Sequence, residues 1–190
     1  LATVRATRDA AEETLVEAAR SRLDEMLACG TTTCEAKSGY GLTTESELKQ
    51  LRVIRTLDAQ HPIDVVATFL GAHEIPPEYR SRHDAYVALI TGEMIPRVAA
   101  ERLADWCDVF CDEGVFTPEE ATVILEAGRQ HGLRPRIHAE ELAVSGGSLV
   151  AARTGARSAD HLVHVDAAGI AALAAANVSA VLLPAAACRR

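Results

Sequence analysis

The sequence has no run of basic residues, no long hydrophobic stretch and few aromatic residues. Of its 190 residues, 27 are acidic and 19 are basic, which gives a formal net charge of −8 at pH 7. This balance disfavours a nucleic-acid-binding protein, which needs clustered Lys and Arg to neutralise phosphates. No apolar run is long enough to span a bilayer, and the first residues contain no signal-peptide core. We therefore expect a cytoplasmic protein that binds neither nucleic acid nor a membrane.

Cysteine is present in a pattern that argues against a disulfide framework. The five cysteines are an odd number and have no compact spacing. Cys107 and Cys111 fall in the segment "WCDVFCDE", where a strand would turn both side chains to the same face. They are either a metal-binding pair or small core residues. No second pair completes a metal site, so reduced core cysteines are the favoured interpretation.

The order of the elements predicts a parallel α/β fold. Six segments have the composition of strands, at residues 30–42, 63–73, 106–115, 133–140, 159–165 and 178–184, and helical segments separate them. Several strands are continuously apolar, which indicates burial on both faces, and strand–helix alternation indicates a parallel sheet. About six such units suit either an open doubly wound sheet or part of an eightfold barrel. The first strand lacks a Gly-x-Gly-x-x-Gly turn, so a dinucleotide-binding fold is the weaker choice.

Residue spacing also predicts where helices begin. Residues 6–29 have the spacing of one helix. Thr44 and Glu47 have the spacing of a capping box at the start of a second helix. Thr117, Pro118 and Glu120 supply an N-cap, a proline at the first helical position and a capping glutamate.

Polar residues recur where each predicted strand ends. They are Glu35, Lys37, Tyr40, His73, Asp112, Glu113, His138, Glu140, Glu141, Asp160 and His161. In a barrel these strand ends meet at the rim where active sites are built. Each residue also has a structural interpretation: the histidine at 138 could be a hydrogen-bonded core residue, and the acids at 140 and 141 could complement a helix start. For Glu35 and Lys37 we favour an internal ion pair.

Five motifs in this order resemble the imidazolonepropionase family of the metal-dependent amidohydrolase superfamily. They are "TTTCEAKSGYGL", "ATFLGAHEIPPEY", "DVFCDEGVF", "IHAEEL" and "SADHL", and the resemblance runs from about Thr3 to Pro184. It implies an incomplete (β/α)8 TIM-type barrel, with residues 1–190 forming one partial domain of about strands 2–7. It also implies hydrolysis of the small molecule 4-imidazolone-5-propanoate to N-formimino-L-glutamate in histidine degradation, with one divalent ion, zinc or iron.

The resemblance assigns a role to five residues. His138 matches the metal-binding histidine at the end of the fifth barrel strand. Glu141 matches an acid that contacts substrate and moves protons. His161 matches a histidine near the scissile carbonyl, and we take both as catalytic. His73 and Tyr40 match substrate-binding positions.

The sequence also departs from the family pattern. The family's His-x-His pair, last-strand aspartate and substrate-binding arginine have no counterpart here, and Asp112 stands where we expect glutamate. We therefore expect an internal piece of the enzyme that is inactive alone. Its sheet would have two exposed edges that could associate, which allows a homodimer. The alternatives are another amidohydrolase or deaminase acting on a cyclic amide or amidine, and a catalytically inactive barrel piece that serves as a scaffold.

Overall fold

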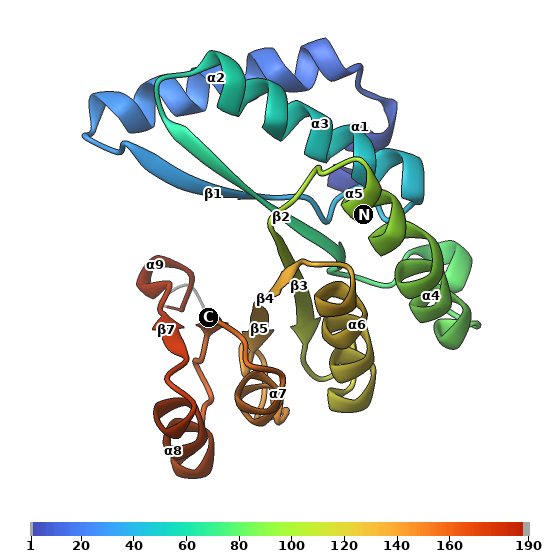
Figure 1. Cartoon of the computed structure of the whole chain (residues 1–190), viewed down its shortest axis with the longest axis vertical. Helices are drawn as coiled ribbons and strands as arrows, with labels where there is room; N and C mark the ends of the chain where they lie inside the picture. The colour runs from blue at the N-terminus through green and yellow to red at the C-terminus, as the bar shows by residue number, and fades with distance from the viewer. Residues whose placement is uncertain (1, 188–190) are drawn as a thin grey trace.

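A curled parallel sheet organises the computed structural model, which describes residues 2–187 (Figure 1). The strands follow one another in the order β1-β2-β3-β5-β6-β7, and β4 pairs with the start of β3. Their bounds are β1 Thr33–Lys37, β2 Asp64–Ala72, β3 Trp106–Cys111, β4 Arg134–Pro135, β5 Ile137–Ala139, β6 Ser158–His161 and β7 Ser179–Val181. Every pairing is parallel. Since β4 and β5 share one strand position, the described residues form six adjacent positions of a (β/α) barrel, as expected.

The helices are α1 Ala2–Asp9, α2 Glu12–Ala28, α3 Thr44–Gln60, α4 His83–Leu89, α5 Ile95–Ala100, α6 Pro118–Gln130, α7 Gly147–Thr154, α8 Ala167–Ala175 and α9 Pro184–Ala187, with a 3-10 turn η1 at Pro77–Tyr79 and a π segment η2 at Ile90–Met94. Helices α2 to α8 lie on the outer, convex side of the curled sheet, and the short α9 follows the end of β7 (Figure 1). None of the helices within residues 2–187 has both the length and the apolar character needed to cross a bilayer.

The single helix expected over residues 6–29 is wrong, because the chain breaks between α1 and α2. Ala11 is extended, with φ −68° and ψ 155°. The Lys49 ammonium, on α3, donates to the carbonyl oxygens of Arg8 and Ala10 at 2.8 and 2.7 Å. A distant lysine thus binds carbonyls at the break, and neighbouring residues give no sign of it.

One predicted helix cap is confirmed and the other is wrong. The Thr117 side chain accepts from the Glu120 amide, and the Glu120 carboxylate accepts from the Thr117 amide, so the capping box at α6 is formed. At α3 the N-cap is Thr43 instead of Thr44. Glu47 does not return to the cap, because its carboxylate binds the preceding loop.

Both faces of the central strands are buried, as expected, but the two faces differ in chemistry. The helix-covered side forms the core. There Gly128 of α6 lies so close to β3 that a Cβ on it would be 2.8 Å from the Cys107 Cβ. Cys107 and Cys111 are fully buried, which confirms them as core residues; Cys188 lies outside the described residues. The opposite face carries polar side chains linked to one another: Glu35, Lys37, Thr68, Asp108, Arg136, His138 and Asp160.

Candidate active site

The carboxyl ends of the strands bring the five predicted site residues together. The Tyr40 and His73 rings meet edge to face with centroids 5.0 Å apart. His73 lies 6.2 Å from His138, which lies 5.1 Å from His161. The Nε2 atom of His161 is 3.4 Å from Oε2 of Glu141. These five residues, here named the rim cluster, come from four segments of the sequence, since His138 and Glu141 share one, and they form one continuous row. Their individual roles remain predictions.

A buried aspartate that the sequence analysis missed orients His138. Nδ1 of His138 is 3.1 Å from both carboxylate oxygens of Asp108, which is completely buried on β3. An ionised carboxylate only accepts hydrogen bonds, so Nδ1 carries a proton and Nε2 is left for another partner. Burial acts to lower the pKa of His138, but the neighbouring Asp108 charge outweighs it and the pKa is raised. The signal for Asp108 was a lone acid inside the apolar run "WCDVFC".

Beneath the rim cluster lies an ion network of Glu35, Lys37, Asp108, Arg136 and Asp160. The Lys37 ammonium is 2.7 Å from Asp108, 3.1 Å from Asp160 and 3.2 Å from Glu35. Arg136 donates to Glu35 at 2.9 Å. Burial acts to lower the Lys37 pKa, but the three carboxylates outweigh it and raise the pKa. The predicted Glu35–Lys37 pair is thus confirmed as part of a larger network.

Three members of this region could hold a metal ion. Asp108, His138 and Asp160 are buried, and one ligand atom from each lies within 4.8 Å of the others. Lys37 already binds both carboxylates, so an ion shared by the two would compete with its ammonium group. His138 is less constrained, because its bond to Asp108 uses Nδ1 and leaves Nε2. A histidine that ligates a metal through one nitrogen commonly donates its other N–H to a carboxylate. The residues therefore fit a metal bound through His138 Nε2.

Of the two adjacent acids, Glu140 is bound into the start of a helix and Glu141 faces the site. Glu140 is buried and accepts hydrogen bonds from the amide and hydroxyl of Ser148 at the start of α7. Burial raises its pKa. Glu141 is turned toward His161, and its own amide donates to the Asp112 carboxylate at 2.7 Å. Glu140 and His161 have φ of +47° and +76°, a strained conformation for such residues that is often found at functional sites.

Asp112 holds the loop that carries Glu141. Besides the Glu141 amide, its carboxylate accepts from the amides of Glu113, Leu142 and Ala143 at 2.8 to 3.2 Å. Asp112 is 4% exposed. Its observed contacts are therefore those of a loop anchor, which the sequence left undecided.

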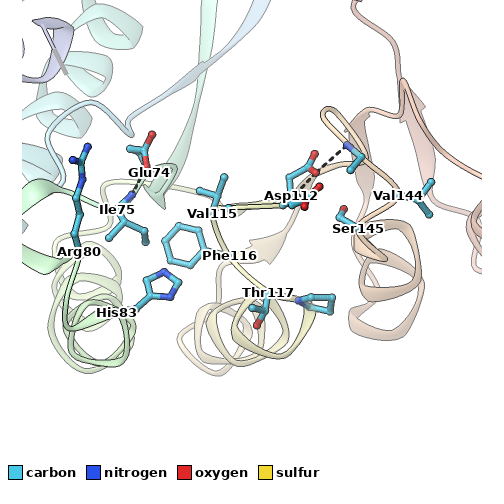
Figure 2. A pocket seen from close by; sticks show the side chains of 14 residues that line it. Glu74, Ile75, Arg80, His83, Asp112, Val115, Phe116, Thr117, Val144 and Ser145 are labelled. Carbon is cyan, nitrogen blue, oxygen red and sulfur yellow. Dashed lines mark hydrogen bonds between the residues drawn. The ribbon is translucent and has the colours of Figure 1, made fainter.

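A cavity of about 990 Å³ lies beside the rim cluster and does not enclose it. It is formed by the loops that follow β2, β3 and β5. Figure 2 shows Glu74, Arg80 and His83 on one side and Asp112 and Ser145 on the other. The cavity touches the site through Asp112. The rim cluster itself lies along the concave side of an open sheet, where a closed pocket is not expected.

Comparison with known proteins places these features in a family. No family model matches the chain. It is 55% identical over 184 residues to the imidazolonepropionase of Shouchella clausii and 54% identical over 183 residues to that of a Geobacillus species. These matches cover 97% and 96% of this chain. By sequence, the chain belongs to the imidazolonepropionase family. It spans 41% and 43% of the length of these two relatives.

Solved structures of the same fold agree with the architecture. The structure matches an adenine deaminase from Arthrobacter aurescens with a TM-score of 0.66 and 15% identity, over 94% of this chain and 54% of that one. It matches an amidohydrolase with a TM-score of 0.62 and 14% identity, over 95% of this chain and 49% of that one. At such identities the likeness concerns the fold alone, and it confirms an incomplete amidohydrolase-type barrel.

Proposed function

We propose that this chain provides the His138 side of a metal-dependent site that hydrolyses 4-imidazolone-5-propanoate to N-formimino-L-glutamate in histidine degradation. The observation that supports the proposal is the rim cluster, in which three imidazoles, a phenol and a carboxylate share one edge of the sheet. Because the chain spans less than half of the relatives' length, the activity is proposed for the protein in which the rest of the barrel is present.

His138 would hold the metal, zinc or iron, through Nε2, and Asp108 keeps the ring in that orientation. A divalent ion lowers the pKa of bound water and polarises a carbonyl, which a resonance-stabilised cyclic amide requires. Lys37 keeps the Asp108 carboxylate charged and in place.

Glu141 and His161 would move the proton and stabilise charge. The Glu141 carboxylate takes a proton from the attacking water while the water oxygen bonds to the ring carbonyl carbon. His161 then donates a hydrogen bond to the oxyanion, an interaction often worth about 3 kcal/mol. When the ring C–N bond breaks, Glu141 returns its proton to the departing nitrogen. Tyr40 and His73 would bind and orient the substrate ring at the other end of the row.

A chimeric enzyme tests this function. The matching 184 residues of the Shouchella clausii relative would be replaced by this chain, and formation of N-formimino-L-glutamate would be measured with zinc or iron added. We expect turnover that falls by at least about 100-fold in H138A, since loss of the metal-binding imidazole removes the metal's electrostatic contribution. H131A, at the C-cap of α6, is the control and should keep full activity.

A folded, metal-loaded chimera without turnover would contradict the proposal. Release of ammonia from a cyclic amidine in place of amide hydrolysis would favour a deaminase. The purified chain alone is expected to be inactive. Among the described residues, the group of possible metal ligands contains a single imidazole, that of His138. Measurable turnover by the chain alone would refute that expectation. The cytoplasmic location and the homodimer stay predictions of the sequence.

A further inference from the structure

One buried carboxylate next to the rim cluster has no part in the proposed reaction. Glu47 lies in the first turn of α3 and is 0% exposed. Within residues 2–187, no ion pair links it to a cation. Its oxygens instead accept hydrogen bonds from the amides of Gly39, Gly41 and Leu42 at 2.9, 2.8 and 2.8 Å. Burial of a charge is costly unless such bonds compensate it. Three converging amides supply the hydrogen-bond donors that the buried carboxylate oxygens need.

The loop is shaped so that its amides converge on this carboxylate. Gly39 and Leu42 have φ of +107° and +56°. Successive amides can point into one concavity only when some residues adopt such angles. A Cβ on Gly39 would lie 2.9 Å from the Leu70 carbonyl oxygen, and one on Gly41 would lie 2.6 Å from the Ser46 backbone. The loop is thus packed tightly between β2 and α3, with Tyr40 at its exposed tip.

The same loop reaches the site through Gly39. Its amide donates to Glu47, and its carbonyl oxygen is 3.0 Å from Nδ1 of His73. A carbonyl oxygen only accepts hydrogen bonds, so Nδ1 of His73 carries the proton. In a neutral ring this leaves Nε2 as an acceptor. The Tyr40 ring meets the His73 ring edge to face, so one loop positions both side chains.

We propose that Glu47 is a positioning residue that clamps the Gly39–Leu42 loop and thereby fixes the Nδ1–H tautomer of His73. In its neutral form His73 then presents Nε2 as a hydrogen-bond acceptor, and the substrate group facing it is a donor such as a ring N–H. This last step rests on the proposed function, whereas the clamp itself does not.

Two measurements on the purified chain at pH 8 test the clamp. Imidazole ¹⁵N NMR reports the His73 tautomer, and hydrogen exchange reports the amides of Gly39, Gly41 and Leu42. In E47Q one carboxylate oxygen becomes an NH2 that cannot accept, so either the Gly39 amide or the Gly41 and Leu42 amides lose their acceptor. We expect the amides that lose it to exchange at least about tenfold faster and His73 to populate both tautomers. The control E45Q removes an exposed carboxylate two residues away on α3 and should change neither.

The outcomes separate positioning from a general effect on stability. If E47Q lowers the melting temperature but leaves the His73 tautomer and the three amides unchanged, the inference is overturned. If E47Q does not fold, the same two measurements on the wild-type chain still test the inference. A predominantly Nε2–H tautomer of His73, or rapid exchange of the three amides, would overturn it.

The chimera distinguishes this inference from the proposed function. There E47Q should raise KM about tenfold with a smaller change in kcat, since substrate-binding groups are misplaced. An inactive chimera with a clamped loop would refute the function and leave the clamp standing. An active chimera in which E47Q alters neither KM nor the tautomer would refute the clamp alone.

Discussion

Individual buried carboxylates determine how the site is held. Glu47 and Asp112 each accept hydrogen bonds from several amides of a loop near the rim cluster, and Glu140 accepts from the amide and hydroxyl of Ser148 at a helix start. Asp108 binds side chains instead and joins Lys37 to His138. None of these partners is close in sequence to Asp108, so the sequence showed an acid in an apolar strand but not its purpose.

Removal of Asp108 should be costly. In D108A, Lys37 and His138 lose their shared anion in a buried setting, and we expect a loss of about 3–5 kcal/mol in the free energy of unfolding. Urea denaturation measures it. The control D105A removes an exposed carboxylate paired with Arg55 at 3.9 Å and should cost less than about 1 kcal/mol. Equal effects of the two substitutions would show that the ion network does not stabilise the fold.

At the level of elements, residue periodicity predicts which helices and strands are present, but not every residue at which a helix begins or breaks. The alternation of strands and helices and the capping box at Thr117 could be read directly, because both depend on residues near one another in the chain. The break between α1 and α2 depends on Lys49, and the loss of the expected Thr44 cap depends on Glu47 binding a loop. The polar concave face was missed because apolar residues on the helix-covered side dominated the composition of the strands.

The close approach of α6 to β3 gives a test at this scale. In G128A the new methyl would lie 2.8 Å from the Cys107 Cβ and 3.0 Å from its sulfur, so helix and strand must separate. We expect a loss of about 1–3 kcal/mol, measured by thermal or urea unfolding. G92A, in the π segment η2, meets no atom within 4 Å and should be neutral or slightly stabilising. A G128A variant as stable as the wild type would contradict the packing.

For the whole molecule, the sequence predicted that distant residues meet at one edge of the sheet, and the structure brings the rim cluster together there. Strand-end positions in a parallel barrel share a rim whatever the loops do, which is why this was predictable. The ion network was not predictable, because its residues meet only through the register in which β1, β3, β5 and β6 are aligned. Within the described residues β1 and β7 each pair on one side only, as expected for a sheet with two edges.

The central claim is that His138 binds a metal through Nε2, and that this metal lies beside the other residues of the rim cluster. Anomalous diffraction from zinc-loaded crystals of the chimera, in which the rest of the barrel is present, tests it most directly. The account predicts a zinc peak about 2.0–2.1 Å from Nε2 of His138, on the side where His161 and Glu141 lie. A zinc peak at an outlying histidine–acid pair such as His83 and Glu120, with none at His138, would contradict it.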